Sequence, residues 1–112
     1  MIRLKPSPTF QFTAEFAVPG EKEPQKVVFV GRHQGQQALA AWTEKAKDLQ
    51  GAELAAYVVS ALKDWEPVND ENGSPVAFSE EACMQLFDDF PGAPSIVALA
   101  YISELSAARR KN

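Results

Sequence analysis

The side chain best suited to covalent chemistry is Cys83, the one cysteine among 112 residues, and the one histidine is His33. A thiol becomes a nucleophile when a nearby base or positive charge lowers its pKa. His33 falls in a predicted loop, whereas Cys83 precedes Met84 on the apolar face of a predicted helix. We therefore expect Cys83 to be a small buried hydrophobic residue. One cysteine and one histidine cannot form an intrachain disulfide or the usual cysteine-rich or histidine-rich zinc site.

The segment 69–73, Asn-Asp-Glu-Asn-Gly, gathers the oxygen atoms that calcium prefers. An EF-hand loop needs glycine at its sixth position and a bidentate glutamate at its twelfth. Counting from Asp70, the twelfth position is Glu81 but the sixth is Pro75. The segment therefore favours an ordinary solvated turn over a calcium site.

Paired carboxylates and glycines are the remaining features that could carry chemistry. Glu80-Glu81 and Asp88-Asp89 are neighbours on predicted helices, so at least one acid of each pair faces solvent. Gly31, Gly35 and Gly73 lack the spacing and the following lysine of a phosphate-binding loop. We expect no catalytic residue, no cofactor site and no metal ligand, and hence a protein that is not an enzyme.

The elements predict an α+β fold: an N-terminal antiparallel β-hairpin, about 9–31, followed by about four helices, about 35–110, packed on one face. Apolar residues alternate with polar ones from Phe10 to Val18, the period of a half-buried strand, and 26–30 is a second strand after the Pro19-Gly20 turn. At this length we expect residues 1–112 to form a single domain.

Apolar residues at helical spacing predict the helices. Leu39, Trp42, Ala46 and Leu49 mark a helix that stops before Gly51, and a stripe from Leu54 to Trp65 marks a second, ended by Pro67. After a turn over 67–75, Val76 and Phe78 can add a short extended piece. Ser79 is the expected N-cap of the third helix. For the last helix, either Ser95 caps it or Pro94 occupies its first turn.

The net charge of −4 is uneven, because residues 34–93 carry eleven Asp/Glu against three Lys/Arg. An acidic chain without a long basic stripe is a poor nucleic-acid ligand, and the basic run Arg109-Arg110-Lys111 suits the last turn of a helix. No stretch approaches the roughly 20 apolar residues of a membrane span. We expect no nucleic-acid partner and no membrane anchor.

Binding surfaces remain the best candidates for function. A two-stranded hairpin leaves unpaired backbone groups at its edges, which predicts self-association through an edge. Charged residues and prolines near the edges could instead block pairing. The residues that we assign to this edge are Phe10, Phe12, Phe16, Val28 and Val30.

The segment 62–79 resembles the pattern of tail assembly chaperones of long-tailed phages and prophages. In that pattern a helix ends in tryptophan, an acidic turn with Gly and Pro follows, and Val-x-Phe-Ser/Thr opens the next helix. The match is carried by Trp65, Asp70, Gly73, Pro75, Val76, Phe78 and Ser79. The resemblance continues over 86–93 and the final helix, and so covers about half of the chain. These residues perform no chemistry and are expected to determine the fold.

The resemblance implies a homo-oligomer in the bacterial cytoplasm, absent from the mature virion. It would bind the tape measure protein and keep it soluble while subunits of the tail tube protein are recruited. A groove for the client would be bordered by Tyr57, Trp65, Phe87 and Tyr101, although aromatic residues at helical spacing are also typical of a core. The alternative is a head-tail connector, tail terminator or adaptor subunit of the particle.

Overall fold

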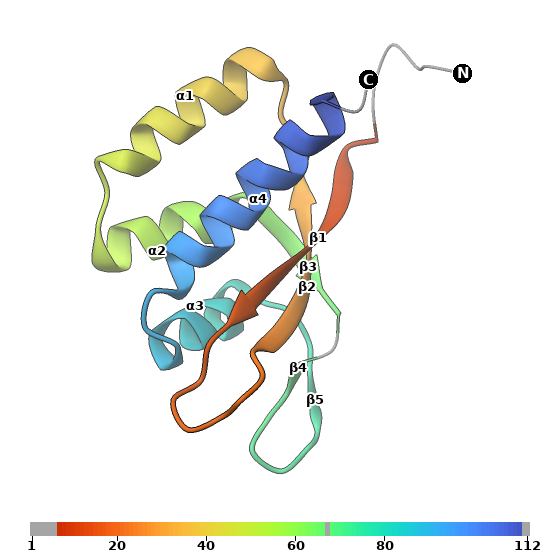
Figure 1. Ribbon diagram of the computed structural model, residues 1–112, viewed down its shortest axis with the longest axis vertical. Coiled ribbons are helices and arrows are strands. Elements are labelled where there is room, and N and C mark those ends of the chain that lie inside the picture. Colours follow the sequence, from red (N-terminus) through yellow and green to blue (C-terminus); the bar gives the residue numbers. More distant parts are fainter. Residues whose placement is uncertain (1–6, 67, 111–112) are drawn as a thin grey trace.

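The computed structural model describes residues 7–66 and 68–110, with side chains as far as Ser106. The strands are β1 (Thr9–Phe16), β2 (Gln25–Arg32), β3 (Leu62–Trp65), β4 (Val68–Asn69) and β5 (Pro75–Val76). The helices are α1 (Gln36–Lys47), α2 (Gly51–Ser60), α3 (Glu80–Asp89) and α4 (Ala93–Arg110) (Figure 1). The predicted α+β class, with its N-terminal antiparallel hairpin and helices, is confirmed.

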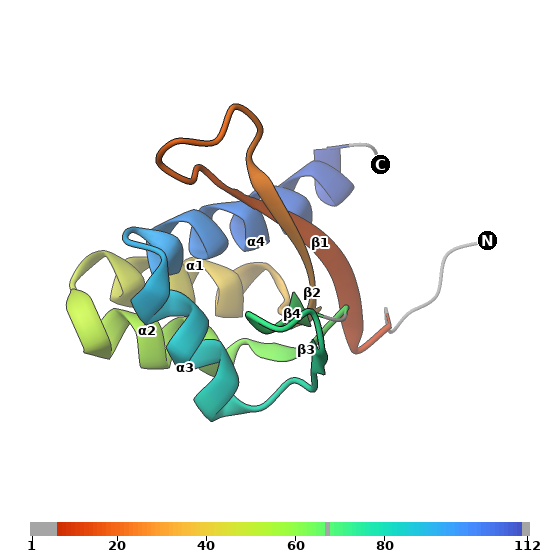
Figure 2. The same cartoon turned by 90° about the horizontal axis from the view of Figure 1, so that it is seen from below.

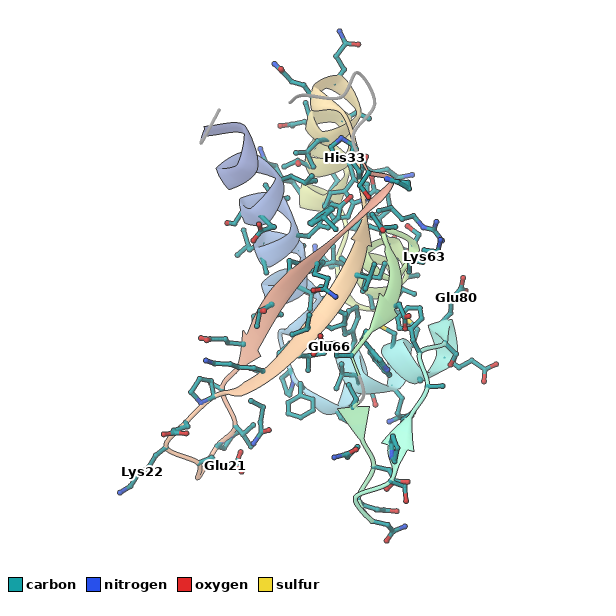
Figure 3. All side chains as sticks on the ribbon, turned by 90° about the vertical axis from the view of Figure 1, so that its right-hand side faces the viewer. Glu21, Lys22, His33, Lys63, Glu66 and Glu80 are labelled. Carbon is teal, nitrogen blue, oxygen red and sulfur yellow. The ribbon has the colours of Figure 1, made fainter. Side chains whose placement is uncertain are left out.

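The β1–β2 hairpin has the alternation that its sequence predicts. Phe12 pairs with Phe29 across the two strands, and both side chains are buried. On the opposite face, Thr13 and Glu15 of β1 are exposed. Figure 3 shows this open face of the sheet toward the viewer, with the helices behind it. One face of the sheet therefore packs on the helices and the other faces solvent.

The prediction of a helix as far as Trp65 is wrong. α2 ends at Ser60, and Leu62–Trp65 forms a third strand antiparallel to β2, so that the sheet order is β1-β2-β3. The register shifts between Val30 and Gly31, which leaves Lys63 as an extra residue in β3. This bulge lets Leu62 and Trp65 both point into the core, although an odd spacing places residues on opposite faces of a regular strand. Spacing of three residues fits a helix equally well, which is why periodicity misassigned the segment.

The last two helices begin where turn chemistry places them. The Ser79 hydroxyl accepts a hydrogen bond from the Ala82 backbone N–H at 3.0 Å and caps α3, as predicted. α4 begins at Ala93 after Gly92, whose φ is +82°, so Pro94 occupies the first turn and Ser95 is inside the helix. The predicted stop signal at Pro67 and the side chains of Arg109, Arg110 and Lys111 lie outside the described residues.

A single cluster of buried side chains joins the sheet to the helices. Tyr101 of α4 is at its centre, with ring centroids 5.7 Å from Phe12 and 5.2 Å from Trp42. The Tyr101 hydroxyl donates a hydrogen bond to the Arg32 carbonyl and accepts one of 2.9 Å from Gln34. These bonds satisfy the hydroxyl inside the core and tie α4 to the end of β2.

A candidate partner-binding groove

A groove opens between three segments that are far apart in the sequence. It holds about 740 Å³ and lies between the Phe16 and Gln25–Val28 ends of the first hairpin, the β4–β5 hairpin and α3. Both hairpins extend from the same end of the molecule (Figures 1 and 3). Seen from below, β4–β5 lies close to the main sheet, and the chain runs on from it into α3 (Figure 2). The groove is therefore a product of the tertiary structure.

The floor of the groove is apolar. Phe16 and Trp65 are buried beneath it, and their neighbours on the floor are half-buried: Val27, Val28, Val68, Val76, Ala82, Leu86 and Phe90. Phe16 and Phe90 pack with ring centroids 5.5 Å apart and join the hairpin to the end of α3. A recess lined by several half-buried apolar residues is a surface on which a partner can bury further apolar area.

The rim of the groove is predominantly acidic. Glu66, Asp70, Glu71 and Asp89 line it and are exposed, whereas Lys26 is the one cationic residue in the lining. The Lys26 ammonium lies 3.6 Å from Glu15 on β1, which partly compensates its charge. The groove therefore presents a net negative rim around an apolar floor.

Three of the four residues predicted to border a client groove belong to the core. Trp65, Phe87 and Tyr101 are 6%, 4% and 1% exposed. Trp65 underlies the groove described above, but Phe87 and Tyr101 do not line it. Direct contact of Trp65, Phe87 and Tyr101 with a partner stays a prediction, and their burial in the core does not support it. The sequence did not predict that residues of the β4–β5 hairpin and the acidic rim line a groove. These residues are brought together only by the fold.

Tyr57 is half-buried, away from that groove. Its ring stacks on Trp42 at 5.0 Å, and its hydroxyl donates a 3.2 Å hydrogen bond to the Trp42 carbonyl. The Lys45 ammonium lies 5.3 Å from the ring centroid, a cation–π distance. These contacts account for Tyr57 as a link between α1 and α2.

The residues predicted for the self-association edge occupy different positions. Phe12 and Phe16 are buried and Phe10 is half-buried. β3 pairs with β2 from Phe29 to Gly31, so placing Val30 on a free edge is wrong. Val28 lies just before this paired stretch, where its carbonyl accepts the Glu66 N–H. β3, which the sequence did not predict, covers that side of β2 from Phe29 to Gly31. β1 is a true edge strand of the described sheet, and association through it stays a prediction.

A family model described as phage tail assembly chaperone matches residues 1–112. The chain belongs to this family. No curated protein and no solved structure matches it. The resemblance inferred from about half of the sequence thus extends over the whole chain, and the role of the family is non-catalytic.

In this tail assembly chaperone, the segment that carries the resemblance builds one wall of the groove. The Trp65 indole N–H donates a 3.0 Å hydrogen bond to the Val76 carbonyl, and the Trp65 ring meets Phe78 edge-on at 5.2 Å. One carboxylate oxygen of Asp70 accepts the backbone N–H groups of Asn72 and Ser74, each at 2.9 Å. Gly73 completes the turn with φ +80°. These residues therefore act as fold determinants, as expected.

Cys83 and His33, the two residues best suited to nucleophilic chemistry, lie on different elements of this chaperone, Cys83 buried in α3 and His33 exposed after β2. Cys83 is 0% exposed, and burial raises the pKa of its thiol from 9.0 to about 12, which keeps it protonated. His33 is exposed just after β2, at the end of the sheet opposite to Glu21 and Lys22 (Figure 3). Since α3 lies away from that end, His33 is not placed to activate the buried thiol.

Within residues 7–66 and 68–110, no three His, Cys, Asp or Glu side chains are grouped as ligands of one metal ion. Among the described helices, none combines the length and the apolar character needed to cross a bilayer.

Proposed function

We propose that this chaperone binds the tape measure protein of its phage and keeps it soluble while tail tube subunits are recruited. The observation that carries the proposal is the family match over residues 1–112. A tape measure protein is a very long helical polypeptide, and its apolar stripe is exposed until the tube closes around it. A chaperone must cover that stripe reversibly.

The apolar groove supports this role, because it offers a recessed surface with an apolar floor. Its half-buried valines and Leu86 can bury more apolar area against a client. One copy covers only a short stretch of a long client. Several copies with modest individual affinity would coat it by avidity.

Self-association would help such coating, and β1 is the strand that would mediate it. β1 spans eight residues and pairs on one side only. In an antiparallel pair of β1 strands centred on Thr13, Gln11 faces the partner's Glu15 and no two like charges oppose each other. The proposal therefore includes a homo-oligomer joined at β1, located in the host cytoplasm.

Co-expression with the tape measure protein from the same phage tests the proposal. We expect the client to move from the insoluble to the soluble fraction and to co-elute with several copies of the chaperone in size-exclusion chromatography with light scattering. An unrelated acidic protein of similar mass is the control. If the client still aggregates and the chaperone elutes alone, the proposal fails.

Mass spectrometry of purified phage particles separates this role from that of a connector or terminator subunit. A chaperone leaves before the particle is complete, so its peptides should be absent. A structural subunit remains in the particle, and its detection at a defined copy number would overturn the proposal.

A further inference from the structure

We propose that the groove docks an amphipathic helix whose apolar stripe is flanked by lysine or arginine residues. The inference rests on the proposed function in one respect: the natural helix would be a segment of the tape measure client. The chemistry of the groove argues for the class of segment, independently of the client's sequence.

The charge of the groove complements a basic partner. Four exposed carboxylates, those of Glu66, Asp70, Glu71 and Asp89, line a groove whose one cationic residue is Lys26. None of the four forms an ion pair with any side chain that the structure describes. Asp70 accepts backbone hydrogen bonds and Asp89 accepts one of 3.0 Å from Gln85, but neither contact neutralises the charge. A partner with basic flanks would supply the missing countercharge and would associate faster than a neutral one.

The α3 wall of the groove has a shape that suits a second helix. Ala82, Gln85, Leu86 and Asp89 line the groove at positions i, i+3, i+4 and i+7 of the helix. This is one continuous stripe of α3, with Leu86 in its middle. A second helix packs along such a stripe by placing its side chains between those of the first. The wall thus favours a helical ligand.

The size of the groove also fits a short length of helix. A helix about 10–12 Å wide occupies roughly 400–600 Å³ for each 5.4 Å turn. The groove volume of about 740 Å³ therefore matches one to two turns. Two or three apolar anchors would enter it, and the remainder of a longer helix would extend beyond both ends.

Extended binding is the competing mode. Gln25–Val28 line the groove, and β3 pairs with β2 only from Phe29 onward, apart from the bond that the Glu66 N–H donates to the Val28 carbonyl. A strand could add to this short piece of edge. The helix is favoured because the lining includes a stripe over two turns of α3 and an acidic rim, whereas the open edge is a few residues long.

The test uses a fluorescent 14-residue Leu/Lys peptide with leucine at i, i+3, i+4 and i+7, and measures its binding by anisotropy. The groove variant carries Glu66→Lys and Asp89→Lys. The matched control carries Asp48→Lys and Glu104→Lys, which are exposed, lie outside the groove and change the net charge equally. We expect the groove variant to bind about tenfold more weakly and the control to stay within about twofold of the unmodified chaperone.

Two further peptides define the ligand. A Leu/Glu analogue should bind at least about tenfold more weakly, and a Leu/Lys peptide with a central proline should bind weakly because it cannot remain helical. Circular dichroism of each variant confirms that it is folded.

Several results would overturn the inference. Equal weakening of the groove variant and the control would indicate attraction to net charge alone. A groove variant that binds like the unmodified chaperone would exclude the groove, and an unaffected proline peptide would indicate an extended ligand. Because the probe is synthetic, these outcomes are separate from a failure to solubilise the tape measure protein.

Discussion

Gly31 and Tyr101 are in direct contact, and the contact leaves no space for a side chain on β2 at that position. A Cβ at Gly31 would lie 2.9 Å from Cε1 and 3.0 Å from Cδ1 of the Tyr101 ring. The ring is held by its core neighbours and by the hydrogen bond from its hydroxyl to the Arg32 carbonyl, one residue beyond the glycine. The contact sets how closely α4 approaches the sheet.

Gly31→Ala should therefore destabilise the protein. Overpacking at a closed contact costs about 1–3 kcal/mol in the free energy of unfolding. Denaturant unfolding followed by tryptophan fluorescence measures it. Gly35→Ala is the control, since a Cβ there meets nothing within 4 Å. Gly35 is the N-cap of α1, where alanine is disfavoured, so a loss of up to about 1 kcal/mol is expected, smaller than that of Gly31→Ala. Equal effects of the two substitutions would contradict the tight contact.

Tyr101→Phe should lower the stability by about 1–2 kcal/mol, because the carbonyl of Arg32 and the amide of Gln34 lose their partner. The ring and its packing stay, so a near-native circular dichroism spectrum is expected. The matched change Tyr57→Phe removes a single, longer bond of 3.2 Å and should cost less. A larger loss at Tyr57 would show that the Tyr101 hydroxyl is not the more important of the two.

Stability should fall at alkaline pH through Cys83. Its folded pKa, about 12, lies above the ordinary value of 9.0, so the unfolded state releases the thiol proton first. The contribution is complete below about pH 9 and is lost as pH rises from there toward 12, with a slope of up to about 1.4 kcal/mol per pH unit. Burial also raises the pKa of Tyr101, although the Gln34 hydrogen bond opposes this, so Tyr101 adds a loss above its ordinary value of 10.0.

Urea unfolding between pH 8 and 11 measures this dependence. Cys83→Ala should reduce the slope of stability against pH between pH 9 and 10. In the native protein, Cys83 should resist alkylation by iodoacetamide until the protein unfolds. An unchanged slope in the variant, or rapid alkylation of the native protein, would contradict the burial of the thiol.

Ser79→Ala should destabilise α3 by about 0.5–2 kcal/mol, because the N–H of Ala82 loses its capping hydroxyl. Ser95→Ala tests the alternative start of α4. Since Ser95 lies inside that helix, its replacement should change the stability by less than about 0.5 kcal/mol. Thermal unfolding measures the stability of both variants. A loss at Ser95→Ala as large as that at Ser79→Ala would indicate that Ser95 caps α4 and would contradict a helix start at Ala93.

Thr13→Lys should weaken self-association if copies pair at β1. The side chain lies on the exposed face of the edge strand, and lysines on edge strands oppose pairing. Light scattering over a concentration series should show a shift toward monomer. Ser103→Lys, exposed on α4, is the control and should leave the mass unchanged. Identical masses for all three proteins would exclude the β1 edge.

Local chemistry made much of the fold predictable from the sequence. Alternation identifies β1 because Phe12, Ala14 and Phe16 must share one face of a strand. Ser79 identifies the start of α3, since its hydroxyl accepts the free N–H of Ala82 and the two acids that follow interact favourably with the helix dipole. The segment from Trp65 to Ser79 indicated the family, and several of its residues hold the local structure: Asp70 and Gly73 form the turn, and Ser79 caps α3.

Only the tertiary structure decided the assignment of 62–65 and the location of the groove. The spacing of Leu62 and Trp65 suits a helix and a bulged strand equally, and the unpaired side of β2 settles the choice by supplying hydrogen-bond partners. Likewise, aromatic residues at helical spacing form the same sequence pattern whether they are buried in a core or exposed to a partner. Contacts between distant segments bury Phe87 and Tyr101. Such contacts also bring Val27, Val76 and Leu86 together in one groove. Periodicity along the chain does not encode these contacts.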